Sequence, residues 1–127
     1  MNISRVLVAI TLIPFAVAAQ QVEPFAGKWS GTVVGGNGAE LALEVSISGA
    51  SGTYRILPRG TQARNNPCFG KEFPVQVTSQ TEAELKFEVK QSSVLPGCPD
   101  QSVTLRNSGA KSLEGTTADG RAVKLSR

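Results

Sequence analysis

The sequence contains no histidine, and this absence restricts its chemistry more than any other feature of the composition. Ser-His-Asp and Cys-His catalysis need an imidazole base, and imidazole is the commonest metal ligand in proteins. The chain has only two cysteines, which are too few to hold zinc without histidine. With no paired carboxylates on the predicted inward faces, we expect no enzymatic activity, no metal and no cofactor.

Aromatic residues and excess charge are also scarce. Aromatic side chains make up 6% of the chain, so platforms for stacking nucleic-acid bases are not expected. The formal net charge is +3, whereas a nucleic-acid binder needs a strongly basic face. No long apolar run follows the N-terminal segment, which argues against a membrane anchor in the mature chain.

The N-terminus has the three parts of a secretory signal peptide. Residues 1–5 carry one positive charge, residues 6–15 are mostly apolar, and residues 16–19 are small. Cleavage after Ala18 and cleavage after Ala19 both fit this pattern, and Ala19 is preferred. The apolar run is shorter than the ~20 residues of a membrane-spanning helix. We therefore expect a secreted or periplasmic mature protein.

Removal of the predicted signal peptide at 1–19 would leave 108 residues, the length of one domain. Within it, we expect an N-terminal arm at 20–26 and a β-domain at 27–127. Arg5 is the only charged residue in the predicted signal peptide, so the mature net charge would be +2. A chain of this kind is expected to be a monomer.

Apolar and polar residues alternate with a period of two through almost all of the mature sequence. In residues 40–48, for example, Leu41, Leu43, Val45 and Ile47 share one face. Such alternation is typical of strands with one buried face, and Gly, Asn and Ser clusters separate the runs. The pattern predicts eight strands and no helix outside the signal peptide. The strands are expected at 27–34, 40–48, 53–57, 72–78, 83–91, 102–107, 112–117 and 121–127.

The short or moderate connections favour an antiparallel meander. Eight such strands close into an all-β, up-and-down barrel that leaves no exposed edge, and a two-sheet sandwich is the alternative. In the meander, the turns at 49–52, 79–82 and 108–111 lie at one end. The long connections 58–71 and 92–101 lie at the other end, where binding residues are most often found.

Cys68 and Cys98 precede the fourth and sixth predicted strands, so both belong to the long-loop end. In an exported chain they are expected to form a disulfide, in preference to two free thiols or half a metal site. The bond would close about thirty residues and stabilise the fold by roughly 3–4 kcal/mol. It would either hold the two long loops together for binding or simply staple a small domain.

The most basic stretch of the chain lies in the first long connection. Arg59, Arg64 and Lys71 occur there without an acidic residue, Arg55 is close before them, and Asp100 lies in the second long connection. The basic residues favour a site for an acidic partner, a glycan or a carboxylate ligand, and all five are candidate binding residues. The alternative is a solvated loop that keeps the protein soluble.

The first and last strands carry a further pattern. Gly27 and Trp29 form a G-x-W sequence, Trp29 is inward, and both Arg121 and Arg127 share the inward parity of the last strand. This combination resembles the calycin barrels, namely lipocalins, avidins and small bacterial metalloprotease inhibitors. The resemblance implies that Trp29, with one of the two arginines stacked on its indole, closes one end of the barrel.

In length, single disulfide and export, the chain is most similar to the bacterial inhibitor barrels. Those proteins insert an N-terminal arm into a protease cleft, and residues 20–24 would be the equivalent arm here. The single Trp gives no basis for the biotin binding of avidins.

We therefore expect an exported, non-enzymatic binding protein that uses the disulfide-linked loop end to bind a protein or an acidic partner. One alternative is an inhibitor of a secreted protease or lysozyme. The other is a carrier of a small apolar ligand inside the barrel, where Gly31 and Gly115 would leave space.

Overall fold

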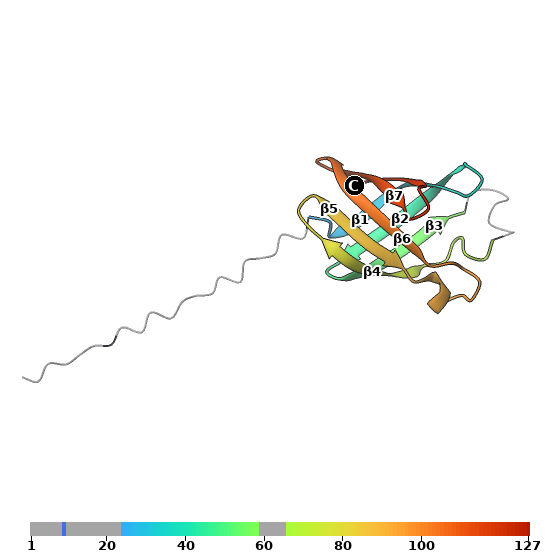
Figure 1. Cartoon of the computed structure of the whole chain (residues 1–127), viewed down its shortest axis with the longest axis horizontal. Helices are drawn as coiled ribbons and strands as arrows, with labels where there is room; N and C mark the ends of the chain where they lie inside the picture. Colours follow the sequence, from blue (N-terminus) through green and yellow to red (C-terminus); the bar gives the residue numbers. More distant parts are fainter. Residues whose placement is uncertain (1–8, 10–23, 59–65) are drawn as a thin grey trace, which may run out of the picture.

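The described part of the molecule is a closed barrel of eight antiparallel strands (Figure 1). The computed structural model describes Ala9, residues 24–58 and residues 66–127. The rest of the predicted signal peptide, the start of the predicted arm, and both Arg59 and Arg64 lie outside the described residues.

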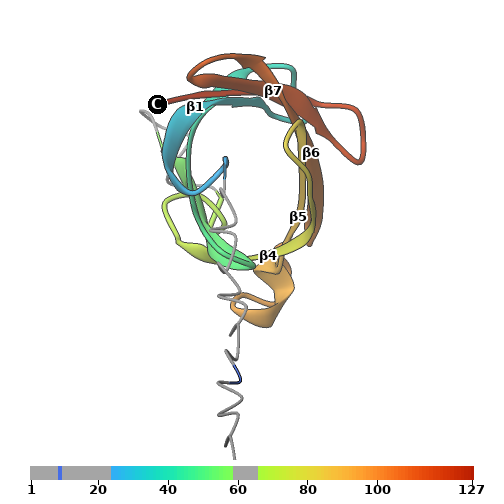
Figure 2. The ribbon, with the colours of Figure 1, turned by 90° about the vertical axis from the view of Figure 1, so that its left-hand side faces the viewer.

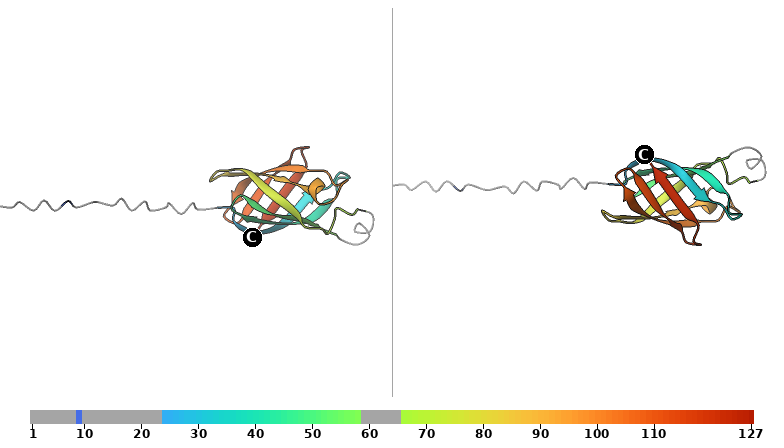
Figure 3. Two further views of the ribbon diagram at one scale, coloured as in Figure 1. Left: turned by 90° about the horizontal axis from the view of Figure 1, so that it is seen from below. Right: turned by 90° about the horizontal axis from the view of Figure 1, so that it is seen from above.

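The strands follow one another around the barrel in chain order, and the last strand pairs with the first (Figure 2). They run obliquely around the barrel (Figure 3). This arrangement confirms the predicted up-and-down barrel and excludes the two-sheet sandwich. The strands are β1 (Gly27–Val34), β2 (Glu40–Ser48), β3 (Ser51–Leu57), β4 (Phe73–Gln80), β5 (Glu84–Val89), β6 (Gln101–Gly109), β7 (Ser112–Thr117) and β8 (Ala122–Ser126).

One short helix departs from the prediction. The fifth strand was expected to reach residue 91, but β5 ends at Val89 and a 3-10 helix, η2 (Gln91–Ser93), follows. The backbone turns there because Gln91 is buried and its carbonyl accepts hydrogen bonds from the N–H groups of Val94 and Leu95. In the part of the chain that the structure describes, no helix has the length and apolar character needed to cross a membrane.

The inward faces of the strands form the core, as the alternation predicts. Twenty hydrophobic residues are buried among those that the structure describes, and Tyr54, Phe25, Phe73 and Phe87 are the largest of those that are fully buried. Val77, which was expected to point inward, is only half-buried. Phe25 precedes the first strand and was assigned to the arm, but its side chain is completely buried in this core.

Gly31 and Gly115 do not provide interior space for a ligand. A Cβ on Gly115 would lie 1.7 Å from the Thr104 carbonyl oxygen, and one on Gly31 would lie 1.9 Å from the Lys124 carbonyl oxygen. The backbone of the adjacent strand therefore occupies the position of the missing side chain. Glycine at these positions permits the close approach of the neighbouring strand.

Candidate functional site

The end of the barrel that carries the chain termini of the β-domain is closed by a contact between them. The Arg127 guanidinium carbon lies 4.2 Å from the centroid of the Trp29 ring. Its two terminal nitrogens donate hydrogen bonds to the carbonyls of Ala26 (2.6 Å) and Pro24 (3.1 Å). Trp29 Nε1 donates to the Phe25 carbonyl at 2.9 Å. The last residue thus fixes the segment that carries buried Phe25, and we call this the closed end.

The open choice between two arginines is settled by these contacts, because Arg127 and not Arg121 stacks on Trp29. Gly27 adopts a φ of +117°, and a Cβ there would lie 3.6 Å from Arg127 Nη1. Glycine is required for this left-handed conformation, which lets the chain enter β1 beneath the guanidinium.

Arg121 lies at the opposite end, where it joins three parts of the barrel rim. Its Nε donates to Asp119 Oδ2 (3.0 Å), Nη1 to the Val34 carbonyl (3.2 Å), and Nη2 to Gln101 Oε1 (3.0 Å). Hydrogen bonds from the Thr117 hydroxyl and from Arg121 lower the pKa of Asp119. The carboxylate therefore stays ionised and holds Arg121 across the rim.

Tyr54 on β3 is buried, with 2% of its surface exposed, and its hydroxyl has no hydrogen-bond partner in the described part of the chain. Burial raises the pKa of Tyr54 to about 12, and the positive charge of Arg121 partly offsets this effect. An unpaired buried hydroxyl destabilises the fold, and ionisation would be more unfavourable still.

We predict that Tyr54 makes the fold sensitive to alkali. Below pH 10 the phenol is neutral in both the folded and unfolded states, so stability is unaffected. Between about pH 10 and about pH 12 the unfolded state ionises more than the folded state, so stability falls, by about 2 kcal/mol at pH 12. Because Tyr54 is the only Tyr, absorbance at 295 nm measures its titration directly. Tyr54→Phe should remove this part of the alkaline instability, and a wild-type midpoint near pH 10 would contradict the prediction.

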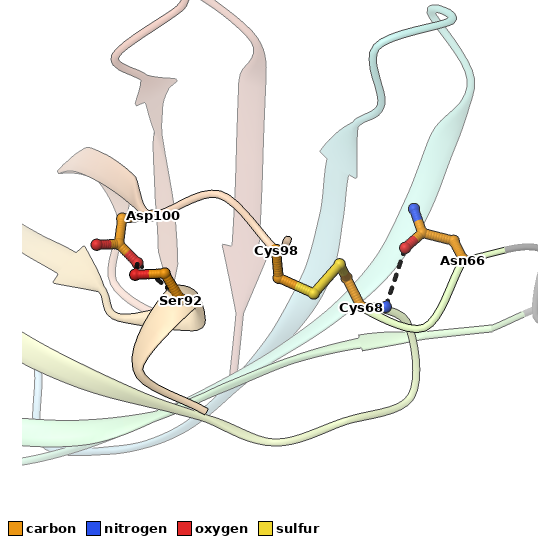
Figure 4. Close-up of a disulfide and its surroundings, with 5 residues drawn as sticks. All are labelled: Asn66, Cys68, Ser92, Cys98 and Asp100. Atoms are coloured by element: carbon orange, nitrogen blue, oxygen red, sulfur yellow. Dashed lines mark hydrogen bonds between the residues drawn. A yellow bond between two sulfur atoms is a disulfide. The ribbon is translucent and has the colours of Figure 1, made fainter. Parts of the chain in front are cut away.

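Cys68 and Cys98 form the predicted disulfide, with a Cα–Cα distance of 5.8 Å (Figure 4). The bond joins the β3–β4 connection to the β5–β6 connection. Near it, Asn66 Oδ1 accepts a hydrogen bond from the Cys68 N–H at 2.9 Å, and the Cys98 N–H donates to the Leu95 carbonyl at 3.1 Å. The described parts of the two long connections are therefore held in place at one end of the barrel.

We call this surface the loop end and define it by residues 35–39, 66–72, 90–100 and 118–121. Two hollows open at the loop end. One, of about 310 Å³, lies between Pro99–Ser102 and the Thr117–Arg121 turn. The other, of about 280 Å³, lies between Gly35–Asn37 and Phe69. Val94 is 40% exposed on the same surface, and half-buried Phe69 and Leu95 pack against the core.

The structure does not bring all the predicted binding residues together. Lys71 is exposed at the loop end, where it was expected. Arg55 instead points outward from the wall of the barrel and forms an ion pair with Glu44 at 3.5 Å. Its position on β3 places it beside Glu44 on β2.

Asp100 has a local role that its position in the sequence did not reveal. Its Oδ1 accepts hydrogen bonds from the N–H (2.9 Å) and hydroxyl (2.8 Å) of Ser92 (Figure 4). These two bonds lower its pKa. Asp100 thereby shapes the β5–β6 connection. Among the described residues, no group of three or more Cys, Asp or Glu is placed to hold a metal ion.

Comparison with known proteins identifies the fold but not a family. No family model matches the sequence, and no curated protein matches it. Among solved structures, the chain is similar to a redesigned β-barrel, with a TM-score of 0.51 and 17% identity. The match covers 82% of this chain and 91% of the redesigned one. At this identity the similarity shows the barrel fold alone.

Proposed function

We propose that the mature chain is an exported, non-enzymatic binding protein that takes a partner protein on the loop end. The observation that carries this proposal is the Cys68–Cys98 disulfide, which ties two long connections together opposite the closed end. Barrel loops much longer than a hairpin needs are where binding usually occurs. Fixing them in advance reduces the entropy lost when a partner binds.

The exposed side chains of the loop end favour a protein as the partner. Among the described residues, Val94 is the only large hydrophobic residue that is exposed. Phe69 and Leu95 are half-buried and also belong to the loop end. Aromatic residues such as Phe69 are enriched in protein interfaces, and burial of exposed apolar surface such as that of Val94 favours association. The closed end, in contrast, is occupied by the contacts of Arg127 with Pro24 and Ala26.

The charge of the first long connection favours an acidic surface on that partner. The sequence from 58 to 71 contains Arg59, Arg64 and Lys71 and no acidic residue. Complementary charge mainly accelerates association and makes it dependent on salt. The N-terminal pattern and the disulfide both favour export to an oxidising compartment, where such a partner would be met.

A capture experiment tests this proposal. Immobilised mature protein should retain a partner from periplasmic or extracellular extract under non-reducing conditions. Val94→Glu should weaken retention about tenfold or more, because it places a charge in an apolar contact. Ala110→Glu is the matched control, since Ala110 is exposed in the β6–β7 turn at the other end. Equal loss in both variants, or in neither, would contradict the loop end as the binding surface.

The basic residues can be tested in the same assay. Arg59→Glu combined with Arg64→Glu should reduce capture while leaving the melting temperature nearly unchanged, because both positions lie in a polar stretch of the sequence outside the predicted strands. Unchanged capture would show that the segment is only a solvated loop.

Inhibition of a secreted hydrolase would be a special case of this function. The captured partner would then be a protease or lysozyme, and its activity would fall in the presence of the chain. A carrier would need an empty interior. This function is not favoured, because twenty hydrophobic side chains of the described residues pack together as one core, and Phe25 belongs to it at the closed end.

A further inference from the structure

A further concave surface lies on the outer wall of the barrel and meets the loop end at Glu72. It has a volume of about 470 Å³ and extends over β8, β1, β2 and β3. Its floor carries four small hydroxyl residues, Ser30, Ser46, Thr53 and Ser126, and we call it the wall trough. Ligand sites typically have volumes of about 300–1,000 Å³.

The strand register explains why the wall is hollow at this place. Ser126 on β8 lies opposite Ser30 on β1, and Ser46 on β2 lies opposite Thr53 on β3. Short side chains on four neighbouring strands leave a depression between longer ones. In the part of the chain that the structure describes, none of these four hydroxyls takes part in a hydrogen bond, so each can both donate to and accept from a ligand.

Three cationic side chains line the same trough. Lys28 lies opposite Ser46 and forms no ion pair with another described residue. Arg127 is held in place by its contacts at the closed end. Arg55 forms an ion pair with Glu44 through Nη2, while its Nε is buried without a hydrogen-bond partner among the described residues. A buried N–H without an acceptor is unfavourable, so an oxyanion that accepts this hydrogen bond would be stabilised.

Other residues of the trough restrict the classes of ligand that it can bind. Glu44 and Glu72 line it as well, so a dense polyanion would be repelled. Trp29 is buried and covered by Arg127, so it offers no exposed ring for a neutral sugar to stack on. Binding must therefore come from hydroxyl hydrogen bonds and from separated anionic groups.

We infer that the wall trough is a binding site for an acidic oligosaccharide with one carboxylate per sugar. Its hydroxyl groups would pair with the Ser and Thr floor, and a carboxylate would interact with Lys28 and Arg55 Nε. This inference does not depend on the loop end, because none of the hydroxyl and cationic residues that line the trough belongs to the loop end.

Calorimetric titration of the oxidised mature protein with trigalacturonate tests the inference. We expect saturable binding, with a Kd at least about tenfold lower than for a neutral galactose trisaccharide, because the neutral sugar lacks the charge-assisted contacts. Inorganic phosphate at matched ionic strength should not compete. Absence of saturable binding at millimolar concentrations, equal affinity for the neutral sugar, or equal competition by phosphate would overturn the inference.

Variants locate the binding on the wall. Lys28→Gln and Ser46→Phe should each raise the Kd for trigalacturonate about tenfold, the first by removing a charge and the second by filling the trough. Lys124→Gln is the matched control, because Lys124 is exposed on β8 opposite Glu114 and Thr32, outside the trough. Trp29 fluorescence checks that each variant is folded. An unchanged Kd in both trough variants would place any binding elsewhere.

Discussion

Reduction of the Cys68–Cys98 disulfide is expected to lower the free energy of unfolding by about 3–4 kcal/mol. The two cysteines are 30 residues apart, and the chain-entropy model gives this value for a loop of that length. The loss is a large part of the stability of a small domain, whose total is about 5–15 kcal/mol. We therefore expect the reduced protein to be marginal at physiological temperature.

Urea unfolding followed by Trp29 fluorescence measures this effect, with and without reductant. The Cys68→Ala/Cys98→Ala variant is the control, since reductant should leave its unfolding midpoint unchanged. A wild-type midpoint that does not move on reduction would show that the bond contributes little, and the two loops would then be held by their other contacts.

Replacement of Phe25 by Ala is expected to lower the free energy of unfolding by about 3–5 kcal/mol, although Phe25 lies outside the strands. Its side chain is completely buried, and both Trp29 and Arg127 hydrogen-bond the backbone around it. Truncation would leave a cavity where the closing contact meets the core. The energetic cost would come from lost apolar burial together with that cavity.

Chemical unfolding of Phe25→Ala, with Val94→Ala as the control, tests this closure. Val94 is 40% exposed, so its truncation should change stability by about 0.5 kcal/mol or less. If the two variants lower the free energy of unfolding by the same amount, the closed end does not contribute to stability in this way.

Most of the fold could be predicted from the period-two alternation, because every strand buries one face in a shared interior. Leu41, Leu43, Val45 and Ile47 are all buried, as their spacing requires. The order of the strands followed from short connections, and the disulfide followed from the placement of Cys68 and Cys98 at one end.

Features that depend on contacts between distant segments could not be predicted in the same way. Phe25 precedes the first alternating run and was assigned to the arm, so it was not predicted to be a core residue. Arg121 and Arg127 share a parity, and the choice between them depended on which end of β8 meets Trp29. The early end of β5 depended on Gln91, a polar residue that the structure buries.

The candidate binding residues were less predictable than the fold. Asp100 was selected for its charge, but its carboxylate accepts two hydrogen bonds from Ser92 and so organises its own loop. Arg55 was grouped with the basic loop by sequence distance, whereas the strand register places it beside Glu44 on the wall. Charge and proximity in sequence do not report the direction of a side chain.

Hydrogen–deuterium exchange on the captured complex tests the central claim most directly, because it reports which surface the partner covers. We predict that binding slows exchange in residues 66–72 and 90–100, on both sides of the disulfide, and leaves residues 24–30 at the closed end unchanged. Slower exchange confined to the closed end or to the wall trough would contradict the assignment of the loop end as the binding surface.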